Sequence, residues 1–146
     1  LHGPTAGPST PTTRRSPIMT APALNSVAWF EFGSDKPEEI QSFYSQLFDW
    51  NFTPNHDLPG VNYHAAITPG APRPGGGIFE SDGTFADYAI FYVLVADVAD
   101  TIACANGLGA EVLMEPLTDA SGVTFARLRD STGNHFGIFS APAPTN

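Results

Sequence analysis

One order of secondary structure is expected twice in this chain, and this repeat limits the fold more than any other feature of the sequence. The first copy opens with an alternating, aromatic-rich run over 26–33, typical of a strand, and continues with helical apolar spacing over 36–47. The second copy opens with a similar run over 90–95 and continues with a helix over 97–105. A strand followed by a helix, used twice, predicts two related modules in one chain.

Three short strands are expected after each helix. They are predicted near 51–54, 63–68 and 76–80 in the first copy, and near 111–115, 123–129 and 136–140 in the second. The last strand of each copy contains the same tripeptide, Gly-Ile-Phe. The sequence therefore predicts an α+β fold of two βαβββ modules, one over about 26–81 and the other over about 88–142.

The length of 146 residues suits one domain with a substantial core. We expect this domain to cover 23–146. Residues 1–22 are rich in Pro, Thr and Ser without apolar periodicity, which predicts a tail, and Met19 is the expected start of the protein.

Strand alternation gives each first strand two faces. Phe30 should lie under the first helix, whereas Trp29 and Glu31 should face away from it, into the concave side of the sheet. In the second module, Ile90 and Tyr92 are expected on the concave side. The concave surface should therefore carry aromatic rings and one carboxylate.

The helices have recognisable start signals. Asp35 with Glu38 three residues later resembles a capping box, and Asp97 is the expected N-cap of the second helix. Cys104 falls on that helix and is expected to be buried. The apolar face predicted for the first helix consists of Ile40, Phe43, Tyr44, Leu47 and Phe48.

Charge and composition narrow the partners. The net charge of −9 disfavours binding to nucleic acid or to anionic membranes, and it favours neutral or cationic ligands. No apolar run approaches the length of about 20 residues that spans a bilayer. We therefore expect a soluble protein. A single cysteine excludes an internal disulfide and gives no sign of an oxidising compartment, so the cytoplasm is the expected location.

Three motifs, in this order and spacing, resemble the glyoxalase/bleomycin-resistance/dioxygenase superfamily, also called the vicinal oxygen chelate (VOC) superfamily. Residues 43–50 are similar to the pattern F-Y-x-x-x-F-G-W, with Asp49 where glycine is usual. Val95-x-Asp97, a helix and Leu-Gly-Ala at 108–110 resemble the start of a second module. Residues 130–137 resemble the turn D-P-x-G-N-x-F, with serine in place of proline.

The resemblance also implies where a metal would bind. In metal-dependent members, the four ligands come from the first and fourth strands of the two modules. The equivalent positions here are Trp29, Gly77, Ile90 and Gly137. None of these side chains can ligate a divalent metal. We therefore expect no metal and no other cofactor, which argues against the usual glyoxalase or dioxygenase chemistry. A displaced metal site that uses His135 and Glu31 stays open as a hypothesis.

The candidate ligand-binding residues are Trp29, Glu31, Ile90, Tyr92 and His135, all expected on the concave face. Glu31 and His135 are also the candidate catalytic residues: Glu31 could accept a proton, and His135 or a tyrosine could act with it as acid and base. An ordinary structural alternative is an ion pair between Glu31 and an arginine of the strand predicted over 123–129.

Three functions are compatible with these residues. The first is a metal-independent protein that binds a small organic molecule, in the manner of a bleomycin-resistance protein. The second is a metal-independent lyase or isomerase that uses Glu31 as acid and base. The third is a metalloenzyme, a lyase or dioxygenase, with displaced ligands. The resemblance further implies a homodimer.

Overall fold

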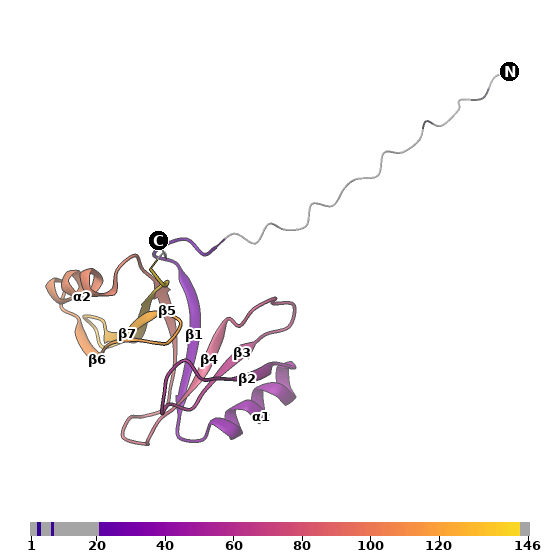
Figure 1. Cartoon of the computed structure of the whole chain (residues 1–146), viewed down its shortest axis with the longest axis horizontal. Helices are drawn as coiled ribbons and strands as arrows, with labels where there is room; N and C mark the ends of the chain where they lie inside the picture. Colours follow the sequence, from indigo (N-terminus) through magenta and orange to yellow (C-terminus); the bar gives the residue numbers. More distant parts are fainter. Residues whose placement is uncertain (1–2, 4–6, 8–20, 144–146) are drawn as a thin grey trace.

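The computed structural model describes residues 3, 7 and 21–143 of the chain (Figure 1). Eight strands form one sheet in the order β2-β3-β4-β1-β5-β8-β7-β6. The elements are β1 (Val27–Ser34), α1 (Pro37–Phe48), β2 (Asn51–Asn55), β3 (Tyr63–Ile67), β4 (Gly76–Glu80), β5 (Tyr88–Leu94), α2 (Val98–Gly107), β6 (Glu111–Thr118), β7 (Thr124–Arg129) and β8 (His135–Ser140). The expected tail, including Met19, lies almost entirely outside the described residues.

The sheet consists of two equivalent halves. The first strands of the two modules, β1 and β5, pair with each other in antiparallel orientation at the centre. Each also pairs in parallel with the last strand of its own module, β1 with β4 and β5 with β8. The two helices lie at opposite ends of the sheet (Figure 1). The prediction of an α+β fold with two βαβββ modules is confirmed.

The two edges of the sheet meet through their loops. The loop after β2 and the loop after β6 are joined by a backbone hydrogen bond from Ala120 N to Asp57 O, 2.9 Å long. The sheet therefore curves until its ends meet, and its concave side is enclosed by both modules.

Aromatic rings fix α1 on the convex side of the first module. The ring centroids of Phe32 and Tyr44 are 4.8 Å apart, and Trp50 lies 5.4 Å from Phe30 and 5.0 Å from Tyr44. Phe30 and Phe32 thus face the helix, as strand alternation predicted. In the second module, Val98 of α2 packs with a core of Val95, Ala126, Leu128 and Ile138.

Part of the expected helix face is not covered. Phe43, Leu47 and Phe48 are each at least half exposed, whereas Tyr44 packs inward. The prediction of a buried Cys104 is wrong, since this side chain is exposed. Both errors have one cause: helical spacing identifies an apolar stripe, but a short helix on a curved sheet covers only part of that stripe.

The two helix starts differ from each other. The predicted N-cap of α2 is confirmed, because the Asp97 carboxylate accepts a hydrogen bond from Asp100 N at 2.8 Å. The predicted capping box of α1 is wrong. Its N-cap is Lys36, which makes no side-chain cap, and the buried Ser34 hydroxyl accepts the Lys36 N–H instead. At the other end of α1, Asp49 has a left-handed backbone with φ of 64°, which explains why glycine is usual there.

No helix of the described residues is long and apolar enough to cross a membrane.

The two caps give a matched test of this fold. Asp97→Ala removes the bond to Asp100 N and should lower the free energy of unfolding by about 0.5–2 kcal/mol. Asp35→Ala removes a carboxylate of the same type that makes no cap, so it should change that free energy by less than about 0.5 kcal/mol. Urea unfolding measures both, and equal losses in the two variants would contradict the assignment of the caps.

Candidate functional site

A buried carboxylate, Glu31 of β1, lies at the centre of the concave side. The residue is only 5% exposed. Its Oε2 atom accepts hydrogen bonds from the hydroxyls of Tyr88 at 2.8 Å and Tyr92 at 2.9 Å. The Tyr63 hydroxyl accepts from Trp29 Nε1 at 3.0 Å and also interacts with the Glu31 carboxyl. Three tyrosines from two strands thus converge on one carboxylate.

Each of these tyrosine rings lies over a glycine of a neighbouring strand. A Cβ atom added at Gly33, Gly77 or Gly137 would come closer than 3.0 Å to the ring of Tyr88, Tyr63 or Tyr92, respectively. Gly33 pairs directly with Tyr88, and Gly137 with Tyr92. The glycines therefore leave the space that allows the rings to lie flat and bring their hydroxyls to Glu31.

The nearest positive charge belongs to Arg127 of β7. Its guanidinium carbon lies 4.9 Å from the Tyr88 ring centroid and 5.5 Å from that of Phe79, and Nη2 is 3.5 Å from Met114 Sδ. Arg127 is buried, and within the described residues no carboxylate lies within 4 Å of it. The cation is therefore held mainly by aromatic faces.

Burial dominates the protonation of this cluster. It raises the pKa of Glu31 above its ordinary value of 4.5, against the hydrogen bonds from Tyr88 and Tyr92 and the charge of Arg127, which lower it. Burial, followed by the charge of Glu31, also raises the pKa of Tyr63, Tyr88 and Tyr92. The tyrosines consequently stay protonated and act as hydrogen-bond donors.

A cavity of about 220 Å³ opens beside Glu31. Its walls are mainly aromatic and aliphatic, and both modules contribute to them. The lining residues are Trp29, Glu31, Asn55, Asp57, Leu58, Tyr63, Phe79, Tyr92, Asp119, Ser121, Val123, Phe125 and Phe139. Apolar walls with a few polar groups are typical of a small-molecule site.

The fold is similar to that of several solved structures. A methylmalonyl-CoA epimerase matches with a TM-score of 0.58 at 12% identity, over 84% of this chain and 100% of that one. The epimerase from Mycobacterium tuberculosis gives 0.55 at 13% identity, over 87% and 95% of the two chains. A hypothetical protein from Bacillus halodurans C-125 gives 0.60 at 13% identity, over 83% and 97%. Neither a protein-family model nor a curated protein sequence matches the chain significantly.

Methylmalonyl-CoA epimerase is a member of the VOC superfamily. The present chain has the VOC fold. The family resemblance noted in the sequence is therefore supported, and at 12–15% identity the likeness to these structures is one of fold.

The positions that would hold a metal in a VOC enzyme do not fit one here. The Tyr63 ring covers Gly77 and the Tyr92 ring covers Gly137, so rings occupy the space in which ligand side chains would project. Across the described part of the chain, no three His, Cys, Asp or Glu side chains lie together as metal ligands would.

Of the five candidate ligand-binding residues, three line the cavity and two do not. Trp29, Glu31 and Tyr92 line the cavity, whereas Ile90 and His135 do not. His135 packs edge-on against Tyr88, with ring centroids 4.8 Å apart. Its Nε2 is buried and has no hydrogen-bond partner among the described residues. Burial, and then the charges of two nearby arginines, lower the pKa of His135, which favours the neutral imidazole.

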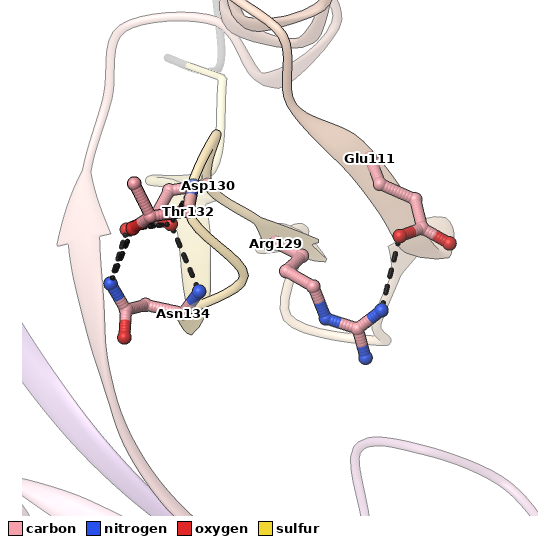
Figure 2. A network of polar contacts seen from close by, with 5 residues as sticks. All are labelled: Glu111, Arg129, Asp130, Thr132 and Asn134. Carbon is pink, nitrogen blue, oxygen red and sulfur yellow. Dashed lines mark hydrogen bonds and ion pairs between the residues drawn. The ribbon is translucent and has the colours of Figure 1, made fainter.

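The alternative of an ion pair between Glu31 and Arg127 or Arg129 is not formed among the described residues. Arg127 acts on Glu31 only through its charge, and Arg129, exposed at the end of β7, bonds Glu111 at 3.0 Å, as Figure 2 shows. In the adjacent turn, the Asp130 carboxylate accepts from the N–H groups of Thr132 and Asn134, both at 2.9 Å (Figure 2). These bonds hold the pKa of Asp130 at about 2. This turn connects β7 to β8, which pair from Thr124–Ser140 to Arg129–His135.

Sequence reasoning missed Tyr63 and Tyr88 as site residues. No face was assigned to the strand predicted over 63–68, and Tyr88 precedes the strand predicted over 90–95. The contact of Tyr88 to Glu31 also spans 57 residues. A usable signal was present: Gly33, Gly77 and Gly137 lie inside predicted strands, where glycine marks the close approach of another group.

The glycine–tyrosine pairs can be tested by adding one methyl group. Gly137→Ala or Gly77→Ala should lower the free energy of unfolding by about 1–3 kcal/mol, because the added Cβ displaces a packed ring. Gly107→Ala is the control, since a Cβ there meets nothing within 4 Å. It should be neutral or stabilising by up to about 1 kcal/mol. Urea titration measures all three, and full stability of Gly137→Ala would contradict this packing.

The raised pKa of Glu31 predicts a pH-dependent stability. Above its ordinary pKa of 4.5, the unfolded chain ionises Glu31 while the folded chain retains the proton, so stability falls as pH rises toward the folded pKa. Glu31→Gln cannot ionise and should escape this loss. Its melting temperature relative to wild type should therefore increase between about pH 4 and pH 8.

Glu115→Gln is the control for these melts, because Glu115 is exposed. Its melting temperature should follow that of the wild type across the whole pH range. A difference between Glu31→Gln and wild type that stays constant, or narrows as pH rises, would show that the Glu31 pKa is not raised.

Proposed function

We propose that this protein binds a small organic molecule in the cavity beside Glu31 and does so without a metal ion. The observation that carries the proposal is the combination of a buried carboxylate, a ring of tyrosine donors and largely apolar walls around about 220 Å³. In this proposal Trp29, Glu31 and Tyr92 contact the ligand directly. Ile90 and His135 do not line the cavity and act indirectly, Ile90 as the neighbour of Glu31 across the β1–β5 pair and His135 through its contact with the Tyr88 ring.

The ligand is not expected to be an acyl-CoA. Structures of the Streptomyces coelicolor methylmalonyl-CoA epimerase hold 2-nitronate-propionyl-CoA. Coenzyme A carries several phosphate charges. The cavity of the present chain is lined by Glu31, Asp57 and Asp119 and by no lysine or arginine, so it would repel such a ligand.

A lyase or isomerase remains the second candidate, and one observation favours it. Burial raises the pKa of Glu31 above its ordinary value, which makes this carboxyl a better proton acceptor once it is ionised. The protonated tyrosines beside it would stabilise negative charge on a substrate. A metalloenzyme with displaced ligands is less compatible with the site, because the tyrosine rings fill the positions of the usual ligands.

Two further expectations accompany the proposal. A homodimer is supported by the exposed apolar side chains of Phe43, Leu47 and Phe48 on α1, which a second chain would cover. A cytoplasmic location is supported by the single cysteine of the sequence.

Native mass spectrometry of the gently purified protein tests the proposal directly. We expect a mass of two chains with an organic adduct and without a transition metal. Val123→Trp should lose the adduct, because Val123 lines the cavity and the larger ring would fill it. Leu108→Trp is the control, since Leu108 is 79% exposed, and it should keep the adduct.

About one zinc, nickel, manganese or iron per chain, removed by a chelator together with function, would overturn the metal-free proposal. An adduct that persists in Val123→Trp would place the ligand elsewhere. A spectrum with only the mass of one chain would contradict the homodimer.

A further inference from the structure

Among the acidic and basic residue types, only acidic ones line the cavity wall. Glu31, Asp57 and Asp119 line the cavity, and no lysine, arginine or histidine does. Glu31 is buried, whereas Asp57 and Asp119 are partly exposed and lie on the two loops joined by the Ala120–Asp57 hydrogen bond. Carboxylates are therefore present from the solvent-exposed loops down to the buried floor.

One cation of the described residues, Arg127, lies near Glu31 without lining the cavity. Among the described residues, Arg127 is the positive charge that acts on Glu31, and its guanidinium lies against the rings of Phe79 and Tyr88. It offsets the charge of Glu31 without entering the wall. Asp57 and Asp119 form no ion pair within 4 Å in the described part of the chain. No cation of the described residues therefore neutralises these two loop carboxylates, although Asp119 Oδ1 accepts hydrogen bonds from Ser121 and from Val123 N.

The strongest hydrogen-bond donors of the wall are already used. Tyr92 donates its hydroxyl to Glu31, and Trp29 donates its indole N–H to Tyr63. The hydroxyls of Tyr88 and Tyr92 both end on Oε2 of Glu31, so Oε1 receives neither bond. The wall consequently offers carboxylate acceptors to a ligand and few donors, which suits a donor-bearing cation and disfavours an anion.

The remaining wall is rich in aromatic rings. Their negative faces attract a cation, most strongly where the ring is indole or phenol and the site is shielded from water. The aromatic residues that line the cavity are Trp29, Tyr63, Phe79, Tyr92, Phe125 and Phe139.

We propose that the ligand of this cavity is a small organic cation, an ammonium group on an apolar body. This inference depends on the proposed binding function and names its ligand class. The apolar body contacts the aromatic and aliphatic walls. The ammonium is held by the aromatic faces together with the carboxylates of Glu31, Asp57 and Asp119.

Binding of a cation would also change the protonation of Glu31. The groups that face Glu31 are the hydroxyls of Tyr63, Tyr88 and Tyr92 and the charge of Arg127. A bound cation would add to Arg127 in favouring the ionised carboxylate, so Glu31 would release a proton on binding. The affinity for a cation should therefore increase with pH, whereas the affinity for a neutral analogue should not.

Three probes that share one benzene ring test the inference: benzylammonium, benzyl alcohol and benzoate. Isothermal titration of the full chain should give the tightest binding for benzylammonium, about tenfold or more tighter than benzyl alcohol, and no measurable binding for benzoate. Raising the pH should tighten benzylammonium alone. Glu31→Gln should remove this pH dependence.

A matched pair of variants separates local from long-range charge. Asp57→Asn should weaken benzylammonium binding about threefold to tenfold and leave benzyl alcohol unchanged. Asp35→Asn changes the net charge equally, but Asp35 is exposed and does not line the cavity. It should bind like the wild type.

The outcomes distinguish the two proposals. Equal affinity for benzylammonium and benzyl alcohol, or tighter binding of benzoate, would overturn the cationic ligand and leave the binding function standing. Equal weakening in Asp35→Asn and Asp57→Asn would also overturn it, by attributing the preference to net charge. If none of the three probes binds, and no adduct appears in the native mass spectrum, both proposals fail.

Discussion

The burial of one carboxylate organises the concave side of this protein. A carboxyl group that is 5% exposed loses most of its hydration, and an ionised form must recover that loss from hydrogen bonds and nearby charge. Glu31 obtains two hydrogen bonds from tyrosine hydroxyls and the more distant charge of Arg127. Desolvation still dominates, since the pKa of Glu31 is raised. The Glu31 carboxyl therefore has hydrogen-bond donors, yet its burial still disfavours ionisation.

The tyrosines reach Glu31 only because glycines lie beneath them. Gly33, Gly77 and Gly137 belong to three different strands, and each leaves room for one ring. Two of these glycines stand at the positions where the VOC resemblance would place metal ligands. A glycine at such a position offers no metal-binding atom, and it leaves space for a tyrosine ring. At these two strand positions the rings of Tyr63 and Tyr92 lie over glycine, beside the Glu31 carboxyl.

The closure of the sheet turns this cluster into a cavity. The hydrogen bond between Ala120 and Asp57 joins the two modules at the edge opposite the central β1–β5 pair. Because both loops in this contact carry a lining aspartate, the closure also concentrates negative charge beside the aromatic walls. The proposed ligand class follows from that arrangement and from the position of Arg127, which lies against two rings and does not line the cavity.

The sequence by itself determined the two modules, their order and the faces of the first strand, because alternation and helical spacing are local properties that read directly from neighbouring residues. It also placed Trp29, Glu31 and Tyr92 on the concave side and Asp97 at the start of a helix. It failed to predict which apolar helix side chains other elements cover: Cys104, Phe43 and Leu47 are exposed. The capping box of α1 failed as well, because the nearby Ser34 hydroxyl takes the bond.

Only the tertiary structure decided which groups meet Glu31. Tyr63, Tyr88 and Arg127 are 32, 57 and 96 residues away in the chain, and their contacts depend on strand register, curvature and the space left by glycines. Parity along a strand tells on which side a residue lies, but not which distant strand faces it. The charge of the cavity was likewise decided by folding, since two loop aspartates approach it only when the edges of the sheet come together.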